Sequence, residues 1–242
     1  MGCDRVQEHV IIDEKTQDDI FFDTEGDAWF NRNSKVLGTD FENDFPLKLI
    51  DLFNLKPTKV LDVGAANGYR LAEISRRFGS GVYVAIEPSH EAIMDGQSRF
   101  PFIEFRRGLM NDLPLQEDEV FDLVIVNFVF HWISRDKLLR SVSELDRAIA
   151  DGGYLILGDF LPDTPTRVKY HHLPNQEVYT YKQSYADIFL SSGLYTLVAQ
   201  LTFDHDLHEF NPEIGGESRG VCSVLRKNKE NLYVTKTFQK NP

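Results

Sequence analysis

The stretch KVLDVGAANGYRLAEI, residues 59–74, decides the fold of this chain. It begins with an apolar run, passes through glycine and small polar residues, and becomes apolar again at helical spacing. This pattern predicts a buried strand, a tight turn and a helix, the first unit of a doubly wound α/β sheet. Ligands of such sheets bind beyond the carboxyl ends of the strands, so the turn over residues 64–68 is where a ligand is first expected.

Composition narrows the class of protein. The chain has 242 residues, 42% of them apolar, which suits one α/β domain with a substantial core. A net charge of −12 argues against nucleic acid as a partner, because phosphate binding needs clustered Lys and Arg. With only Cys3 and Cys222 there is no disulfide framework, which predicts a reducing cytoplasm. The polar start predicts no signal peptide, and the apolar runs are too short to span a membrane.

Strands and helices are predicted to alternate along the chain. Near-continuous apolar strands between amphipathic helices indicate a parallel sheet covered on both faces, and the last two strands, with no helix between them, should pair as an antiparallel hairpin. The fold class is therefore Rossmann-like α/β, mostly parallel with a C-terminal antiparallel hairpin. The predicted strands are 59–64, 81–88, 102–108, 121–128, 154–160, 194–203 and 220–227, and the clearest helices are 134–150 and 184–192.

We predict a single domain with three parts. Residues 1–40 are polar and aromatic without a clean period, and we interpret them as an arm or lid with short helices. Residues 41–227 form the catalytic core, and residues 228–242 form a polar tail. Within the core, residues 160–183 show no usable period; a long irregular connection in a compact domain is usually functional.

The turn itself favours a nucleoside without a pyrophosphate. A dinucleotide fingerprint, G-x-G-x-x-G, would place glycines where this chain has Ala66 and Tyr69. Glu87 ends the second strand about 20 residues after the turn, where an acid binds the ribose hydroxyls in dinucleotide folds. A ligand with a ribose and no phosphate, such as S-adenosylmethionine, fits both observations.

Five segments carry a family resemblance: VLDVGAANG, VAIEPS, GLMNDLP, FDLVIVNFVFHWI and GGYLILGDF. In order and spacing they resemble the class I S-adenosylmethionine-dependent methyltransferases, most of all the small-molecule branch of the quinone-biosynthesis type. The resemblance covers about residues 45–225. It implies S-adenosylmethionine as the cofactor and S-adenosylhomocysteine as its product.

The resemblance also implies which residues contact the cofactor. Those of the glycine turn surround its methionine part, the acid after the second strand binds its ribose, and the later segments line the adenine and the sulfonium. The implied set is Asp62, Gly64, Ala65, Gly68, Glu87, Pro88, Met110, Asn111, Asn127 and Phe128. Leu109 departs from the family, which often has an acid there, so a backbone carbonyl or Asp112 would hold the adenine amino group.

Three histidines are candidates for the catalytic base. His131 follows the fourth strand, where the transferred methyl group should lie, although a packed histidine between aromatic neighbours is an equal reading. His171 and His172 lie in the segment where the family builds its substrate wall. Adjacent histidines can indicate a metal, but no third ligand is suitably spaced, so no metal is predicted.

Four further residues are predicted to contact the substrate. Trp29 and Arg32 belong to the distinctive arm sequence EGDAWFNRN; large apolar side chains there are either core plugs or a lid over the cationic sulfonium. Asp159 ends the fifth strand, and Tyr170 belongs to the irregular segment.

These expectations predict an enzyme that transfers a methyl group in line to oxygen or nitrogen of a small molecule. A sugar or nucleotide-linked sugar is the suggested acceptor. The alternatives are a non-catalytic protein that retains the fold as a binding partner, and an NAD-linked oxidoreductase, which Ala66 and Tyr69 disfavour.

Overall fold

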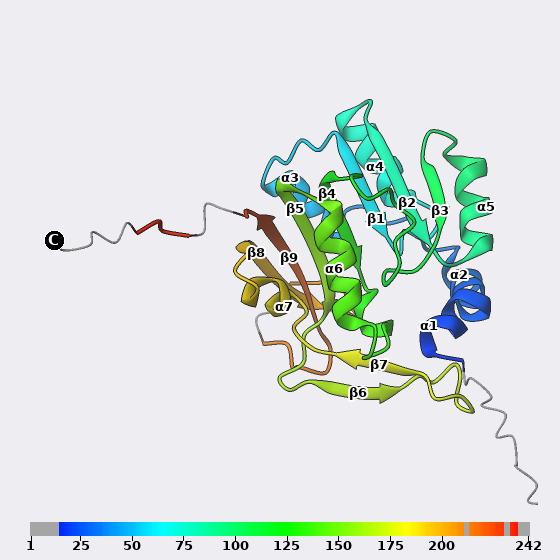
Figure 1. The fold of residues 1–242 in the computed structure, drawn as a ribbon. Coiled ribbons are helices and arrows are strands. Elements are labelled where there is room, and N and C mark those ends of the chain that lie inside the picture. The colour runs from blue at the N-terminus through cyan, green and yellow to red at the C-terminus, as the bar shows by residue number, and fades with distance from the viewer. Residues whose placement is uncertain (1–14, 211–212, 230–232, 237–242) are drawn as a thin grey trace, which may run out of the picture.

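The computed structural model describes residues 15–210, 213–229 and 233–236. Cys3, most of the predicted tail and the first 14 residues of the predicted arm therefore lie outside the described residues. The described chain forms one seven-stranded sheet and one two-stranded ribbon (Figure 1).

The seven-stranded sheet has the predicted doubly wound order β3-β2-β1-β4-β5-β9-β8. Its parallel strands are β1 (Lys59–Val63), β2 (Val82–Glu87), β3 (Glu104–Arg107), β4 (Phe121–Asn127) and β5 (Ile149–Phe160). The hairpin of β8 (Tyr195–Asp204) and β9 (Arg219–Lys227) is antiparallel and pairs through β9 with β5. The predicted fold class is thus confirmed.

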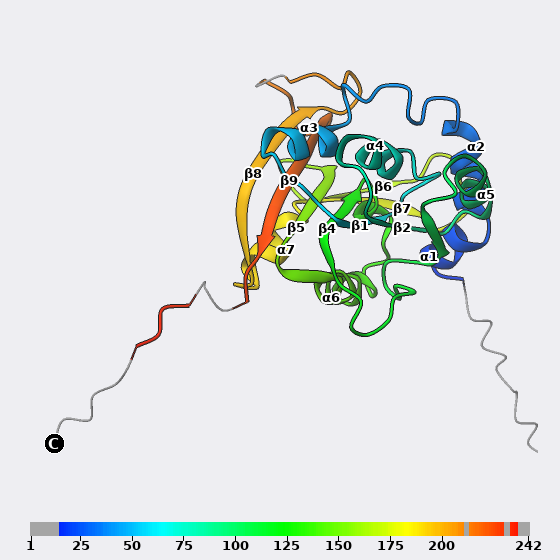
Figure 2. The same cartoon turned by 90° about the horizontal axis from the view of Figure 1, so that it is seen from above.

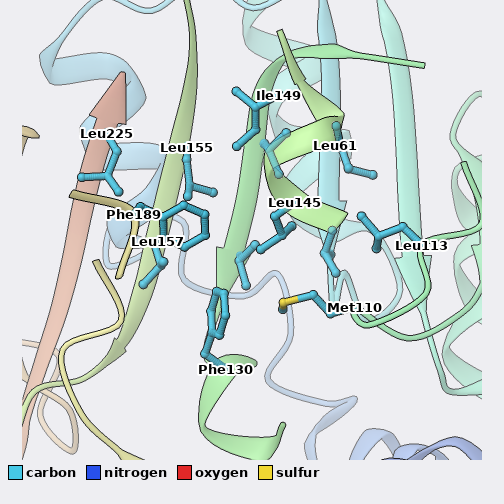
Figure 3. Packing of buried hydrophobic residues seen from close by; sticks show 14 of the residues in the cluster. Leu61, Met110, Leu113, Phe130, Leu145, Ile149, Leu155, Leu157, Phe189 and Leu225 are labelled. Carbon is cyan, nitrogen blue, oxygen red and sulfur yellow. The ribbon is translucent and has the colours of Figure 1, made fainter. Parts of the chain in front are cut away.

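Helices cover both faces of this sheet (Figure 2). On one face lie α3 (Phe45–Leu52) and α4 (Tyr69–Phe78); on the other lie α6 (Leu138–Ala148) and α7 (Ala186–Ser191). The helix α5 (His90–Arg99) packs beside β3. Figure 3 shows the packing between α6 and the sheet, where Leu145 belongs to the same buried cluster as Leu61 and Leu155.

The N-terminal arm has the predicted short helices. They are α1 (Gln17–Ile20), the single π-helical turn η1 (Phe21–Glu25) and α2 (Gly26–Asn33). A capping box opens α1, in which Thr16 and Asp19 satisfy each other's backbone N–H groups.

Two predictions of local structure were wrong. The helix expected over 134–150 begins at Leu138 and ends at Ala148, because β5 begins at Ile149. The segment 160–183 is not irregular: it contains the antiparallel ribbon β6 (Thr166–Lys169) and β7 (Tyr179–Lys182). β6 is exposed and β7 is half-buried along its whole length, so neither strand alternates between a buried and an exposed face that the sequence could record.

The turn between β1 and α4 depends on left-handed backbone conformations. Gly64, Ala66 and Gly68 have φ of 74°, 49° and 76°. A Cβ atom at Gly64 would also lie 2.3 Å from Cγ2 of Val129, in the segment after β4. Glycine is therefore required at position 64 by conformation and by contact.

We expect Gly64→Ala to lower the free energy of unfolding by about 3 kcal/mol, the sum of left-handed strain and a steric clash. Gly152→Ala is the matched control, since Gly152 has φ of 79° and nothing within 4 Å of an added Cβ. The control should lose only the strain, about 1 kcal/mol. Urea unfolding of both variants measures the difference. Equal losses of unfolding free energy would mean that a Cβ atom at position 64 does not clash with Val129.

Candidate active site

A cavity of about 830 Å³ lies at the carboxyl ends of the parallel strands. Its wall comes from the turn after β1, the ends of β2 and β4, the arm and the ribbon, together with the segment after β8. It is within the size range of small-molecule sites. The predicted site residues that line it are Trp29, Arg32, Gly64, Glu87, Pro88, Met110, Asn127, Phe128, His131, Tyr170, His171 and His172.

Glu87, at the end of β2, holds the glycine turn in place. Its Oε2 accepts a hydrogen bond from the backbone N–H of Ala66 at 2.8 Å, and its Oε1 accepts one from Ser89 at 3.0 Å. Each oxygen keeps a further lone pair, and the residue lines the cavity. The carboxylate can therefore accept the two hydrogen bonds that a ribose diol donates.

Burial raises the pKa of Glu87 to about 7, with the nearby acids Asp62 and Asp27 adding to the rise and the two backbone bonds opposing it. The folded protein thus binds a proton here that the unfolded chain loses near its ordinary pKa. Folding stability from this group is present at acidic pH and falls as pH rises toward 7. Binding a donor to the carboxylate has the opposite dependence, because it favours the ionised form.

Asp62 does not line the cavity, which corrects its prediction as a direct cofactor contact. It is fully buried in β1, where its Oδ2 accepts a bond of 3.1 Å from Arg70. Arg70 also pairs with Asp44 at 3.0 Å, and both of these residues line the cavity. Burial raises the pKa of Asp62 to about 6, although Arg70 opposes the rise. Asp62 therefore positions Arg70, a residue that the sequence motifs did not single out.

Three other predicted cofactor contacts also lie behind the cavity wall. Gly68 packs closely on β3, since an added Cβ would lie 2.7 Å from Cζ of Phe105. Ala65 donates its backbone N–H to the carbonyl of Ile86 at 3.2 Å. Asn111 is outside the lining, with its buried Oδ1 lacking a hydrogen-bond partner among the described residues. These residues shape the wall rather than form its surface.

His131, in the cavity wall, forms a pair with Asp159 behind it. His131 is 4% exposed and lies in η2 (Phe130–Trp132), just past β4. Its Nδ1 lies 2.9 Å from Oδ1 of Asp159, and its backbone N–H donates to Oδ2 at 3.2 Å. Because a carboxylate only accepts, Nδ1 carries the proton and Nε2 is left as the basic nitrogen. Asp159 is fully buried and does not line the cavity, so its prediction as a substrate contact was wrong; it orients His131.

Aromatic rings form the wall beside this pair. Phe128 has φ of 56°, and its ring lies 5.2 Å from that of Phe160 and 4.9 Å from that of His205. His205 follows β8, far along the chain from the motifs. Phe203 and His208 from the same region also line the cavity. No local pattern pointed to them, because only the strand order brings the end of β8 to this cavity.

The arm and the ribbon are joined over the cavity by one buried polar network. The hydroxyl of Tyr170 donates to Oε1 of Glu25 at 2.8 Å and accepts from Nη2 of Arg32 at 2.9 Å. Arg32 also forms an ion pair with Glu25. Arg32, 34% exposed and predicted to meet a ligand carboxylate, lines the cavity but is already paired with an acid.

Further contacts hold the arm on both sides. Gln17 exchanges two hydrogen bonds with the backbone of Tyr179 in β7, at 2.7 and 2.8 Å. Asp27 accepts a bond of 2.6 Å from Ser89 at the start of α5. The arm thus bridges the ribbon and the edge of the sheet next to Glu87.

His171 and His172 differ from His131 in their surroundings. Both are exposed at the rim of the cavity, with their ring centroids 4.0 Å apart. Among the described residues, no acid forms a hydrogen bond with either ring as Asp159 does with His131, so the geometry favours His131 as the base. Within the described ranges, no group of three or more His, Cys, Asp or Glu side chains is placed to hold a metal ion.

The comparisons with known proteins agree with this geometry. Residues 60–153 match the family model of a methyltransferase domain. This stretch is thus similar to methyltransferase domains. It carries the glycine turn, Glu87 and His131, and it confirms the predicted resemblance; the arm and the ribbon lie outside it.

One similar protein is the malonyl-[acyl-carrier protein] O-methyltransferase 1 of Coxiella burnetii. It is 29% identical over 118 residues, which are 49% of this chain and 39% of that protein. The chain thus matches about two-fifths of the length of this curated relative.

Two solved structures share the fold. The 1,6-didemethyltoxoflavin-N1-methyltransferase of Burkholderia thailandensis has a TM-score of 0.63 at 15% identity, with 84% of this chain and 85% of that chain covered. The N-methyltransferase NodS of Bradyrhizobium japonicum has a TM-score of 0.57 at 14% identity, with 83% and 92% covered. Both were solved with S-adenosylhomocysteine, in agreement with the predicted cofactor class. In the part of this chain that the structure describes, no helix is long and apolar enough to cross a membrane.

We expect Tyr170→Phe to loosen the arm. The change removes the hydroxyl between Glu25 and Arg32 and should cost about 1–2 kcal/mol. Hydrogen exchange over residues 17–33 should become faster, while exchange in β1 and β4 stays unchanged. Tyr181→Phe, on the same ribbon, is the control, because the Tyr181 hydroxyl makes no hydrogen bond to a described residue. If both variants behave alike, the network does not hold the arm.

Proposed function

We propose that this protein is an S-adenosylmethionine-dependent methyltransferase that acts on oxygen or nitrogen of a small acceptor. The observation that carries the proposal is a single cavity lined both by Glu87 with the glycine turn and by His131, which is paired with Asp159 behind the wall. One cavity can therefore bring a nucleoside and an acceptor together. The methyltransferase domain over residues 60–153 and the fold support the same activity.

The cofactor chemistry fits the residues present. When bound, S-adenosylmethionine supplies an electrophilic methyl group on a sulfonium sulfur. Glu87 would accept the ribose hydroxyls, and Pro88 and Met110 would offer apolar surface to the adenine. Phe128 and Trp132 line the same cavity and would favour a nearby cation through their ring faces.

The chain's own contribution is alignment, exclusion of water and acceptance of a proton. The arm and ribbon close the cavity, and fixed alignment of two reactants can lower a barrier by several kcal/mol. His131, with its ring oriented by Asp159, would accept the proton of an attacking hydroxyl or amine at Nε2. In this proposal residues 1–40 act as the lid, 41–227 as the catalytic core and 228–242 as a tail.

The acceptor is the open part of the proposal. A sugar or nucleotide-linked sugar, expected from the polar rings near the cavity, receives no support from the relatives. Their names instead make a malonyl thioester a second candidate for O-methylation. The arm and the ribbon lie outside residues 60–153, so the match does not extend to the residues that would select the acceptor.

The buried free thiol of Cys222 supports a reducing compartment, and the cytoplasm is the one we propose.

Calorimetric titration tests the proposal. S-adenosylhomocysteine should bind, and NAD should bind more weakly or not at all. Because the ribose donates to ionised Glu87, with its pKa of about 7, affinity should rise about tenfold from pH 6 to pH 8. Glu87→Gln should weaken binding by about 1–3 kcal/mol and remove this pH dependence.

A folded protein that binds NAD and not the adenosyl ligand would overturn the assignment. Adenosyl binding that is independent of pH and of Glu87 would place the ribose elsewhere. Binding of S-adenosylhomocysteine with no methyl transfer to any acceptor would favour the alternative, a non-catalytic cofactor-binding partner protein.

A further inference from the structure

Four lysine or arginine side chains line the cavity, and three of them have carboxylate partners. The lining cations are Arg32, Arg70, Lys169 and Lys182. Arg32 pairs with Glu25, and Lys169 pairs with Glu177 at 3.0 Å. Arg70 lies between Asp44 and Asp62. For Lys182, by contrast, no carboxylate of the described chain lies within ion-pair distance.

The strand β7 directs Lys182 into the cavity. Side chains alternate between the two faces of a strand. Thr180 and Lys182 line the cavity, whereas Tyr181 points to the other face, where the guanidinium of Arg135 lies 4.2 Å from its ring. Lys182 is half-buried, and its Nζ lies 4.0 Å from the ring centroid of Phe160.

The ammonium of Lys182 lies beside the rings that surround His131. The ring of Phe160 lies 5.0 Å from that of His131 and 4.7 Å from that of His205. Asp159, at the same end, is already engaged by His131 and by the backbone N–H of Phe160. The pKa of His205 is lowered, first by burial and in small part by the charge of Lys182, while Asp206 at 3.3 Å opposes the shift. Among the described residues, neither of these acids forms an ion pair with Lys182.

We propose that Lys182 binds an anionic group of the acceptor, a carboxylate or a phosphate, so that the acceptor is an organic anion. This inference rests on the proposed methyl transfer and adds the substrate class to it. A half-buried ammonium stacked on a ring is only partly hydrated. An anion beside it, in a cavity of reduced dielectric, therefore interacts with it more strongly than in water. The rings of Phe128 and Phe160 would contact the apolar part of the acceptor next to its anion.

Matched probes that differ in charge test this site. The full chain, saturated with S-adenosylhomocysteine, is titrated by NMR with benzoate, with its neutral isostere benzamide, and with phenyl phosphate. The anions should bind at least about tenfold more tightly than benzamide. Lys182→Met should reduce that preference to about twofold or less, and Lys182→Arg should retain most of it. Lys169→Met is the control, because Lys169 lines the same cavity with an acid already paired to it, and it should keep the preference.

The outcomes separate the two proposals. Binding of S-adenosylhomocysteine is measured first for the wild-type chain and for each variant. A wild-type chain that does not bind it would overturn the proposed function. If the cofactor product binds but neither anion binds saturably, or anions and benzamide bind equally, the anion site is refuted. A preference that survives Lys182→Met in folded protein refutes it as well. With the preference confirmed, the tighter of benzoate and phenyl phosphate distinguishes a carboxylate acceptor from a phosphate one.

Discussion

The cavity depends on the hydrogen bond from the N–H of Ala66 to the carboxylate of Glu87. This bond fixes a turn whose residues at 64, 66 and 68 all adopt left-handed conformations, a state that L side chains avoid. It also brings the carboxylate to the surface of the cavity, at the carboxyl edge of the sheet. The same group therefore maintains the shape of the cavity and, in the proposed function, would accept hydrogen bonds from the ribose hydroxyls; burial raises its pKa to about 7.

Two segments outside residues 60–153, the stretch that matches the methyltransferase family model, complete the cavity wall. The arm is held by Tyr170, which follows β6, and by Ser89, which follows β2, so that it is tied both to the ribbon segment and to the sheet. A reaction that must exclude water benefits from such a cover. Because both segments lie outside residues 60–153, we infer that the shared domain provides cofactor binding while the arm and ribbon provide the choice of acceptor.

Much of the fold could be predicted from sequence, because buried parallel strands leave apolar runs and the helices between them leave a clear period. The ribbon β6–β7 could not, since β6 is exposed and β7 is evenly half-buried, so neither strand has one fully buried face. Glu87 and His131 could be predicted as site residues because Glu87 ends β2 and His131 follows β4, at the edge where ligands of such sheets bind, and both line the cavity. Asp62 and Asp159 also lie near the ends of strands at this edge, but they are buried behind the cavity wall, where each one positions a basic side chain. Lys182 and His205 became visible only with the strand order, which no local pattern encodes.

A crystal structure of the full chain with S-adenosylhomocysteine tests the central claim most directly. We predict that the ribose hydroxyls lie within hydrogen-bond distance of Glu87, about 2.6–3.2 Å, and that the sulfur faces Phe128 and His131. The arm should remain joined to Tyr170 over the ligand. A nucleoside bound away from Glu87, or a sulfur directed away from the His131–Asp159 end, would contradict the account.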